Sequence, residues 1–353
     1  MERYGYDPNI HIPSDISLAV GRVISEQRGL YKVMTEHGET SAKPSGKMYY
    51  VSADETSLPS VGDFVGMVYN GNRGDSIISE ILPRKSVFVR KAAGISNRPQ
   101  TLAANFDYVF VVTSMNLDFN ISRIDRYVAL AWESGGIPVI ILSKSDLCKD
   151  RTEIIREINE SHPGVGFHMV SSITGEGMEE LAGYFRNNRT VVFLGSSGVG
   201  KSSLLNFLSG EKMMEVKELR SGLEKGRHTT SHRELFILPG GGIVIDTPGM
   251  RELGLWHAGD GIEKGFADIT ARIAMLAQNC RFSDCSHAGE PGCAVAEALE
   301  NDGLDEEAYE RYMKLRKESM FMETKISEKA TYESRKKQKQ FSRMIKNIKK
   351  EIW

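Results

Sequence analysis

Hydrophobic positions along the chain change their spacing after about residue 83. From Leu18 to Pro83 they form short runs separated by turn residues, and most of these turns contain glycine, which is typical of strands. Strands are expected at 19–24, 30–34, 47–51, 63–69 and 76–82. Five short strands predict a small closed barrel, and the oligonucleotide-binding (OB) fold is the commonest five-stranded choice. Residues 1 to 15 carry little pattern and are expected to form a loose arm.

Beyond residue 108, apolar runs of strand length alternate with stretches of helical spacing. Strands are expected at 108–113, 137–142, 165–170, 190–194, 234–238 and 242–246, and helices at 122–133, 152–161 and from 203. This alternation predicts a parallel α/β sheet covered by helices. From Ile262 onward the sequence is mostly helical in character, and its last fifty residues are charged and amphipathic.

Composition is that of a globular protein with a basic end. The 353 residues are 40% hydrophobic, and the net charge is only −2. No apolar run approaches the ~18 residues of a membrane helix, and the first residues lack the apolar core of a signal peptide. We therefore expect a cytoplasmic protein with no membrane contact. Between Thr324 and Trp353, ten Lys or Arg stand against three Glu, which suits RNA phosphates, with a solvated basic helix as the alternative.

The strongest chemical signal is a phosphate-binding loop at residues 195–202. It fits G-x-x-x-x-G-K-[ST] at every fixed position and lies between a predicted strand and a predicted helix, as the motif requires. Its glycines let backbone N–H groups converge on phosphate oxygens. Lys201 is expected to reach the β- and γ-phosphates, and the Ser202 hydroxyl to bind Mg²⁺. The expected nucleotide contacts are Gly195, Ser196, Ser197, Gly198, Val199, Gly200, Lys201, Ser202 and Ser203.

Two later segments complete the expected phosphate and magnesium site. Asp246 ends a predicted strand in the motif Asp-Thr-Pro-Gly, where it can hold Mg²⁺ through water, and the N–H of Gly249 can reach the γ-phosphate. The polar loop 226–233 is expected to be a switch segment, in which Thr229 or Thr230 can complete the Mg²⁺ shell. The expected Mg²⁺ residues are Ser202, Thr230 and Asp246.

The base-reading element is expected at Ser143-Lys-Ser-Asp146, which follows a strand as Asn-Lys-x-Asp does in GTPases. Asp146 would accept hydrogen bonds from the N1 and N2 donors of guanine and would remain unpaired against adenine. Ser143 replaces the usual Asn, so we expect a weaker tie to the phosphate loop and weaker GTP affinity. The expected base contacts are Ser143, Lys144, Ser145 and Asp146, together with Ser171 and Ser172 in a loop that resembles the guanine O6-binding loop.

The order of these motifs is unusual. Most GTPases carry the phosphate loop first and the base elements last, whereas here 143–146 and 171–172 precede 195–202, 226–233 and 246–249. Joining the ends of this stretch would restore the usual order, so the sequence predicts a circularly permuted G domain. Both switch segments then run directly into the C-terminal part, which can receive the state of the γ-phosphate.

Three cysteines and one histidine lie close together in the C-terminal part. Cys280-x4-Cys285-x-His287-x5-Cys293 supplies three thiolates and an imidazole, a tetrahedral Zn²⁺ set with no vacant position. We therefore expect one structural zinc ion that stabilises a segment with few apolar residues of its own. The remaining cysteine, Cys148, is expected to pack as a small apolar side chain.

Together these features resemble the ribosome small-subunit-dependent GTPase A family. The resemblance rests on the motif order, the zinc spacing, Gly226-Arg-His-Thr-Thr230, Asp246-Thr-Pro-Gly249, Leu82-Pro-Arg-Lys-Ser86 and Val89-Arg-Lys-Ala-Ala-Gly94. It implies an OB-fold RNA-binding domain at 1–88, a permuted G domain at 95–262 and a zinc-binding domain with a basic helical tail at 263–353. It also implies a GTPase that binds the small ribosomal subunit and its rRNA late in maturation, is activated by the subunit and leaves after hydrolysis. We expect a monomer.

The residue after Gly249 bears on catalysis. Ras-type enzymes place a water-positioning Gln there, and here it is Met250. His228 in the switch loop is the nearest candidate, in agreement with the family resemblance, and contact of His228 with rRNA is the alternative. The alternative function is a non-hydrolysing, GTP-sensing RNA-binding module. An ATP-dependent enzyme is disfavoured by Asp146.

Overall fold

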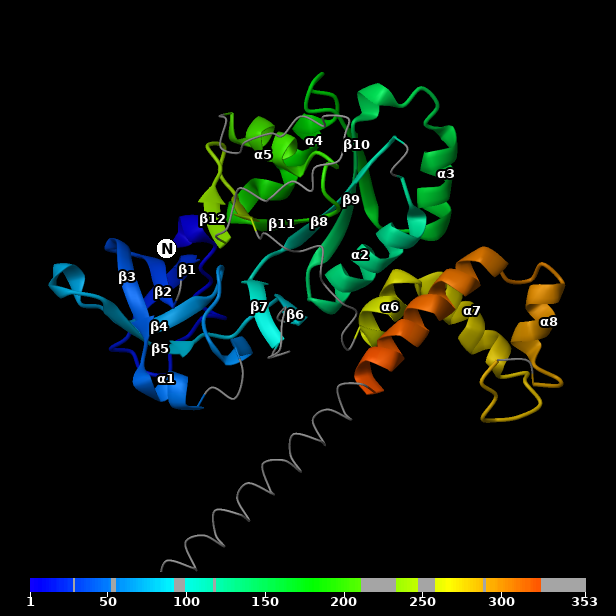
Figure 1. Ribbon diagram of the computed structural model, residues 1–353, viewed down its shortest axis with the longest axis horizontal. Helices are drawn as coiled ribbons and strands as arrows, with labels where there is room; N and C mark the ends of the chain where they lie inside the picture. The colour runs from blue at the N-terminus through cyan, green and yellow to red at the C-terminus, as the bar shows by residue number, and fades with distance from the viewer. Residues whose placement is uncertain are drawn as a thin grey trace, which may run out of the picture.

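The computed structural model describes residues 1–27, 29–51, 55–91, 99–116, 119–210, 233–246, 258–287 and 290–324. A barrel, an α/β layer and a group of helices follow one another across the molecule (Figure 1). The barrel and the α/β layer share one sheet, whose strands are ordered β10-β9-β8-β11-β13-β12-β1-β2-β3-β5-β4. The barrel, the parallel sheet and the C-terminal helices predicted from the sequence are therefore confirmed.

The first part is a closed five-stranded barrel. Its strands are β1 (Ala19–Gln27), β2 (Leu30–Thr35), β3 (Gly38–Pro44), β4 (Phe64–Val68) and β5 (Ser76–Ile81). Strand β1 pairs with both β2 and β4, and β3 pairs with β5, so the sheet closes on itself in the manner of the OB fold. Apolar side chains from all five strands fill the interior, among them Val23, Val33, Ala42, Val65, Met67 and Ile78.

The third strand differs from the prediction. Residues 47–51, predicted as a strand, lie in helix α1 (Gly46–Val51), and the third strand is β3. The Ser45 hydroxyl accepts a hydrogen bond from the Met48 N–H at 3.3 Å, which caps the start of the helix. The hydrophobic pattern misses β3 because this strand is mostly polar and buries only Ala42 and Pro44.

The N-terminal residues are also more ordered than expected. A short 3-10 helix, η1 (Glu2–Tyr4), brings Tyr4 against the core of the α/β layer. His11 is buried, and its ring centroid lies 3.9 Å from that of Phe64 in the barrel. The arm is therefore packed between the two parts, although its sequence carries no periodic pattern.

The α/β layer has the predicted alternation. Its parallel strands are β8 (Tyr108–Ser114), β9 (Ile137–Ser143), β10 (Gly166–Val170), β11 (Thr190–Leu194) and β13 (Ile243–Asp246), with β12 (Arg233–Ile237) antiparallel to β13. Its helices are α2 (Ile121–Glu133), α3 (Thr152–Ser161), α4 (Met178–Ala182) and α5 (Lys201–Ser209). Alternate β8 side chains enter two cores: Val109 packs with α2 and α3, and Phe110 packs with α4 and α5. Helices therefore cover both faces of the sheet.

Shorter elements complete the part of the chain that the structure describes. Strands β6 (Val87–Lys91) and β7 (Pro99–Ala104) form a separate antiparallel pair that the sequence pattern does not predict. The 3-10 helices are η2 (Glu55–Ser57), η3 (Gly71–Arg73), η4 (Ser145–Leu147) and η5 (Gly183–Asn188). The C-terminal helices are α6 (Gly259–Gly265), α7 (Ala267–Ala277), α8 (Ala294–Glu300) and a helix over 306–324. No helix within these described ranges has the length and apolar character needed to cross a membrane.

One buried arginine joins the barrel to the α/β layer. Arg22 of β1 is 1% exposed, and its guanidinium donates to the carbonyls of Gly62 (3.2 Å) and Asn105 (2.9 Å) and to the Thr190 hydroxyl (3.1 Å). Burial lowers its pKa to about 10, although nearby carboxylates oppose this shift. The guanidinium thus holds three segments that are distant in sequence. Backbone pairing adds to this connection, since β12 runs antiparallel to the end of β1.

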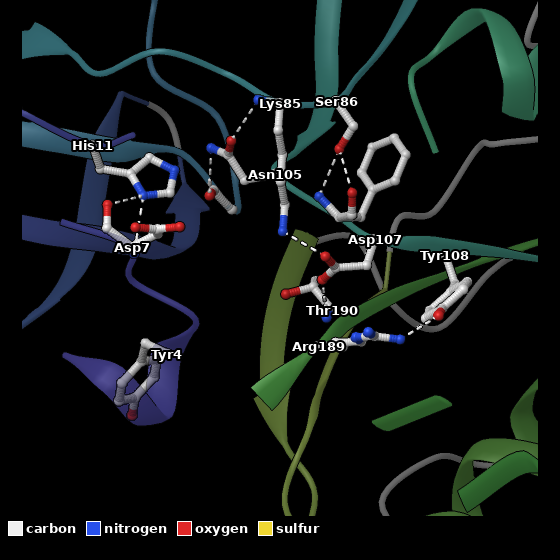
Figure 2. A network of polar contacts seen from close by, with 12 residues as sticks. Tyr4, Asp7, His11, Lys85, Ser86, Asn105, Asp107, Tyr108, Arg189 and Thr190 are labelled. Carbon is white, nitrogen blue, oxygen red and sulfur yellow. Dashed lines mark hydrogen bonds and ion pairs between the residues drawn. The ribbon is translucent and has the colours of Figure 1, made fainter. Parts of the chain in front are cut away.

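Figure 2 shows the polar contacts beside this arginine. The backbone N–H of Lys85 donates to the Asn105 side chain at 3.1 Å, and the Lys85 ammonium lies 2.6 Å from Asp107. Asp107 in turn accepts a hydrogen bond from the backbone N–H of Thr190 at 2.7 Å. Immediately before Lys85, Arg84 forms a bidentate pair with buried Asp63 of the barrel. The Leu82–Ser86 motif therefore fixes the barrel to the layer that follows it.

Replacing Arg22 by methionine is expected to lower the free energy of unfolding by about 3 kcal/mol or more, because several buried acceptors lose their donor. Urea denaturation of the full chain measures the change. Arg156→Met is a matched control, since Arg156 is an exposed arginine of α3 that pairs with Glu153 and Glu160 of its own helix. A similar loss of stability in both variants would contradict a special role for Arg22.

Candidate functional site

The phosphate loop lies between β11 and α5, as predicted. Gly195, Gly198 and Gly200 have φ angles of 155°, 78° and 99°, which favour glycine. A Cβ on Gly195 would also lie 2.3 Å from the Val112 carbonyl oxygen, so no larger residue fits there. Lys201 begins α5, and its ammonium donates to the carbonyls of Gly195 (2.8 Å) and Ser196 (2.6 Å). The phosphate loop therefore holds in place the lysine that is expected to bind the phosphates of the nucleotide.

The other residues of the loop are arranged for ligand access. Ser197 and Gly198 are exposed, whereas Val199 is buried in the sheet core and anchors the loop. Ser202 and Ser203 are half-buried in the first turn of α5. This combination of an anchored base and an accessible tip suits a loop that closes around an anion.

Asp246 lies beside the phosphate loop because β13 is the neighbour of β11 in the sheet. Burial raises the pKa of Asp246, and the positive charge of Lys201 opposes this shift. A divalent cation would favour the ionised carboxylate in the same way, so Asp246 and the hydroxyl of Ser202 fit the expected Mg²⁺ set. The third expected residue, Thr230, lies outside the described residues, as do His228, Gly249 and Met250.

The expected base loop contacts the phosphate loop directly. The Ser143 hydroxyl lies 2.5 Å from the Val199 carbonyl oxygen and 3.1 Å from that of Thr113. Lys144 has a left-handed φ of 57°, and its ammonium donates to the Gly198 carbonyl at 2.7 Å. The short serine side chain therefore does tie the two loops together, contrary to the looser connection expected. Its effect on GTP affinity stays a prediction.

The second base loop is connected to the first by two residues that motif spacing does not identify. Glu176 accepts from the Ser145 hydroxyl at 2.6 Å and from the Arg151 guanidinium at 2.5 Å. Arg151 also donates to the Ser145 carbonyl at 3.0 Å and holds the pKa of Glu176 below its usual range. Asp146 remains exposed beside this connection.

The loop that contains Glu176 begins at Ser171. Ser171 is buried and its hydroxyl accepts from the backbone N–H groups of Ile173 and Thr174, while Ser172 is half-buried. Both base loops and the phosphate loop follow parallel strands of one sheet, so they meet at its carboxyl edge. Ligands of open α/β sheets bind at this edge.

Helix α2 contributes one further residue to the same edge. The Arg123 guanidinium donates to the Ser196 hydroxyl of the phosphate loop at 2.8 Å. Sequence motifs do not indicate this contact because 73 positions separate the two residues. The contact arises because β8, which leads into α2, is the sheet neighbour of β11.

The predicted zinc ligands form a compact cluster. The ligand atoms of Cys280, Cys285, His287 and Cys293 all lie within 4.8 Å of one another. The sulfur atoms of Cys280 and Cys293 are 3.7 and 3.5 Å from Nδ1 of His287. Bond lengths of about 2.3 Å to sulfur and 2.1 Å to nitrogen give a tetrahedron with edges of roughly 3.6 Å, so the cluster fits one metal ion.

Two local features hold this cluster in place. The Cys293 sulfur accepts the Ala296 N–H at the start of α8, and Cys293 packs with Val295 and Leu304 in a small apolar core. Cys148 lies apart from the cluster, half-buried against the main core, as expected of a small apolar side chain.

The basic tail beyond residue 324 lies outside the described residues.

A family model and two relatives that match this sequence carry the same family name. The RsgA GTPase family model matches residues 81–256. The small ribosomal subunit biogenesis GTPase RsgA 1 of Oceanobacillus iheyensis is 40% identical over 342 residues, which cover 97% of this chain and 96% of that protein. RsgA 2 of Listeria monocytogenes is 42% identical over 330 residues, which cover 93% and 91% of the two chains.

Solved structures show the same architecture. YjeQ from Thermotoga maritima has a TM-score of 0.59 and 28% identity, and the match covers 86% of this chain and 98% of that one. YloQ, described as a circularly permuted GTPase, has a TM-score of 0.56 and 24% identity, with 87% and 96% covered, and shares the fold. The family resemblance seen in the sequence is thereby confirmed: this chain belongs to the RsgA GTPase family.

Proposed function

We propose that this protein is a GTPase that acts in the biogenesis of the small ribosomal subunit and is stimulated by that subunit. The observation that carries the proposal is the convergence of 143–146, 171–177 and 195–202 at one edge of the sheet. The relatives that match nearly the whole chain are named as GTPases of small-subunit biogenesis. Such a role places the protein in the cytoplasm.

Different residues of the site bind different parts of the nucleotide and its metal ion. Asp146 and Lys144 select guanine, while Lys201 and the loop N–H groups bind the phosphates. Ser202, Thr230 and Asp246 hold Mg²⁺, which neutralises charge on the β- and γ-phosphate oxygens when bound. His228 orients the attacking water, since Met250 has no group that can do so. Slow turnover without the subunit follows if that histidine is positioned only on the subunit.

The parts of the chain outside the nucleotide site bind the small ribosomal subunit in this proposal. We propose the boundaries 1–88 for an OB-fold RNA-binding domain, 95–262 for the G domain and 263–353 for a zinc-binding domain with a basic tail. The end of the barrel at β5 supports the first of these ranges, whereas β6 and α6 each extend across a proposed boundary, at 88 and at 262. Zinc in the Cys280 cluster is structural, because four protein ligands leave no open position. The protein acts as a monomer that contacts rRNA through its two outer domains.

GTP turnover measured against the concentration of purified small subunits tests the proposal. Wild-type turnover should rise with subunit concentration and saturate. His228→Ala should retain subunit binding with a non-hydrolysable GTP analogue but lose about 10²-fold or more of the stimulated rate, as expected for loss of a positioned acid–base group.

The outcomes separate the alternatives. A wild-type chain that binds GTP and subunits without any hydrolysis would show a GTP-sensing RNA-binding module in place of an enzyme. Normal stimulated turnover of His228→Ala would remove the histidine from the mechanism and require a group supplied by the ribosome.

A further inference from the structure

Glu176 connects the two loops that are expected to hold the guanine base. Its backbone carbonyl accepts the N–H of Ser171 at 3.0 Å, which closes the loop that starts there. Its side chain reaches the other loop and accepts the Ser145 hydroxyl at 2.6 Å. Ser145 is fully buried and directly precedes Asp146. A single residue therefore ties the two base loops to each other.

The position of Glu176 is set by the glycines on either side of it. Gly175 and Gly177 have φ angles of 82° and 69°, which favour glycine. A Cβ on Gly177 would also lie 2.1 Å from the Met169 carbonyl oxygen, so the turn lies directly against strand β10. The backbone therefore leaves the Glu176 side chain little freedom in where it begins.

Arg151 binds both partners of the contact between Glu176 and Ser145. Two guanidinium nitrogens donate to the two carboxylate oxygens of Glu176, at 2.5 and 3.1 Å. One of these nitrogens also donates to the Ser145 carbonyl at 3.0 Å. That carbonyl belongs to the planar peptide group that joins Ser145 to Asp146. The guanidinium therefore fixes the peptide plane from which Asp146 extends.

The contribution of this ion pair is to local geometry. The Arg151 and Glu176 side chains are 31% and 40% exposed, and exposed ion pairs add little to the free energy of unfolding. This pair, however, also binds a buried hydroxyl and a backbone carbonyl of the base loop. The hydrogen bond from Arg151 holds the pKa of Glu176 below its usual range, so the carboxylate is ionised at neutral pH.

Recognition of guanine by Asp146 requires an accurate orientation of its carboxylate. Two hydrogen bonds, from N1 and N2 of the base, must form on one carboxylate, and hydrogen bonds weaken steeply when they are misaligned. The Asp146 side chain is itself exposed, so its orientation depends on the backbone that carries it. The contacts of Arg151 and Glu176 act on that backbone.

We propose that Arg151 and Glu176 form a base-loop clamp, which positions Asp146 for two-point recognition of guanine and thereby sets the preference for guanine over bases with one matching donor. This inference rests on the guanine site proposed above. Arg151 and Glu176 act through Ser145 and are positioning residues.

A matched control lies further along the same chain segment. Arg156 forms an exposed ion pair with Glu153, and both residues belong to α3. Arg156→Met removes this pair without changing the contacts of the base loops. Arg151→Met removes the guanidinium, whereas Arg151→Lys keeps the charge but loses the planar fork. Glu176→Gln keeps an acceptor for the Ser145 hydroxyl and removes the negative charge.

The experiment measures the affinity of the full chain for GDP and for inosine diphosphate, whose base lacks the N2 amino group, by displacement of a fluorescent GDP analogue. Wild type should prefer GDP, because hypoxanthine offers Asp146 one donor fewer. Arg151→Met and Glu176→Gln should each lose about tenfold in GDP affinity, within the range for one charge-assisted hydrogen bond, and less for inosine diphosphate. Arg151→Lys should keep part of the preference, and Arg156→Met should match wild type within about twofold.

Turnover separates positioning from general damage to the site. On small subunits, both clamp variants should raise KM for GTP while kcat at saturating GTP stays within about threefold of wild type, because a base contact is equally strong in the ground state and the transition state. Damage that reached the phosphate loop would lower kcat as well.

Two results would overturn the inference. The ratio of GDP to inosine diphosphate affinity could be unchanged in Arg151→Met and Glu176→Gln, or both affinities could fall equally together with kcat. Failure of the proposed guanine site is distinguishable, because wild type itself would then show no preference for GDP. Thermal unfolding identifies any variant that misfolds, and Arg151→Lys then decides, since a wild-type preference in that variant would contradict a role for the guanidinium fork.

Discussion

Replacing Lys201 by alanine is expected to reduce kcat/KM for GTP hydrolysis by at least about 10³-fold, since even one neutral transition-state donor is worth about 10²–10³. Lys201 is the cation of the phosphate loop, and its ammonium already lies within hydrogen-bond distance of two loop carbonyls. Alanine removes the charge from the β- and γ-phosphates while leaving the helix α5 intact, because alanine is a good helix former. The substitution should therefore separate phosphate binding from folding.

Two measurements check this result. Titration with a fluorescent GTP analogue gives the loss of binding, and steady-state hydrolysis with small subunits gives the loss of turnover. Lys264→Ala, at an exposed lysine in the last turn of α6, is the control and should change neither by more than about twofold, as is usual for surface positions. Wild-type hydrolysis by Lys201→Ala would remove residues 195–202 from the active site.

Replacing Cys293 by serine is expected to release the metal and unfold the segment around the cluster. The protein as purified under reducing conditions should contain about one zinc ion per chain, because four ligand atoms surround one position. Cys293 is both a ligand and part of the small core with Val295 and Leu304, so its loss removes two sources of stability. Metal analysis by mass spectrometry and hydrogen exchange across residues 258–324 measure both effects.

Cys148→Ser is the matched control for the metal. Cys148 is a thiol outside the cluster and donates to the Asp150 carbonyl at 3.1 Å, so its replacement should leave the zinc content unchanged. GTP binding should survive in both variants, since the base and phosphate loops lie within residues 143–246. Zinc-free wild-type protein with native-like exchange protection in this segment would rule out a structural metal.

The sequence predicts the α/β layer closely because its strands are nearly continuous apolar runs. Helix α3 and strand β11 have the predicted bounds. The errors occur where pattern and environment disagree: β3 is polar, and the residues at 47–51 favour strands by composition but follow the capping residue Ser45. A hydrophobic pattern reports burial, and these segments bury little.

In the candidate site, too, the sequence identifies residues that belong to one local motif and misses contacts between segments that are distant in sequence. The phosphate loop and the cysteine cluster are local motifs with fixed spacing, so the sequence identifies them. Arg123, Arg151 and Glu176 are missing from that prediction because each acts on a segment brought near by the fold. Ser143 illustrates a further limit, since only the backbone geometry shows that a short side chain reaches the Val199 carbonyl.

The pairing of β12 with β1 has a consequence for the solubility of the molecule. Unpaired strand edges offer rows of N–H and C=O groups to other chains, and such edges promote aggregation. Strand β1 occupies the outer side of β12 at Arg233 and Glu234, so the barrel protects the nucleotide-binding sheet at that border. A chain that began after residue 85 would present this border to its own copies. Self-association would then accompany, and obscure, any loss of the RNA contact proposed for the barrel.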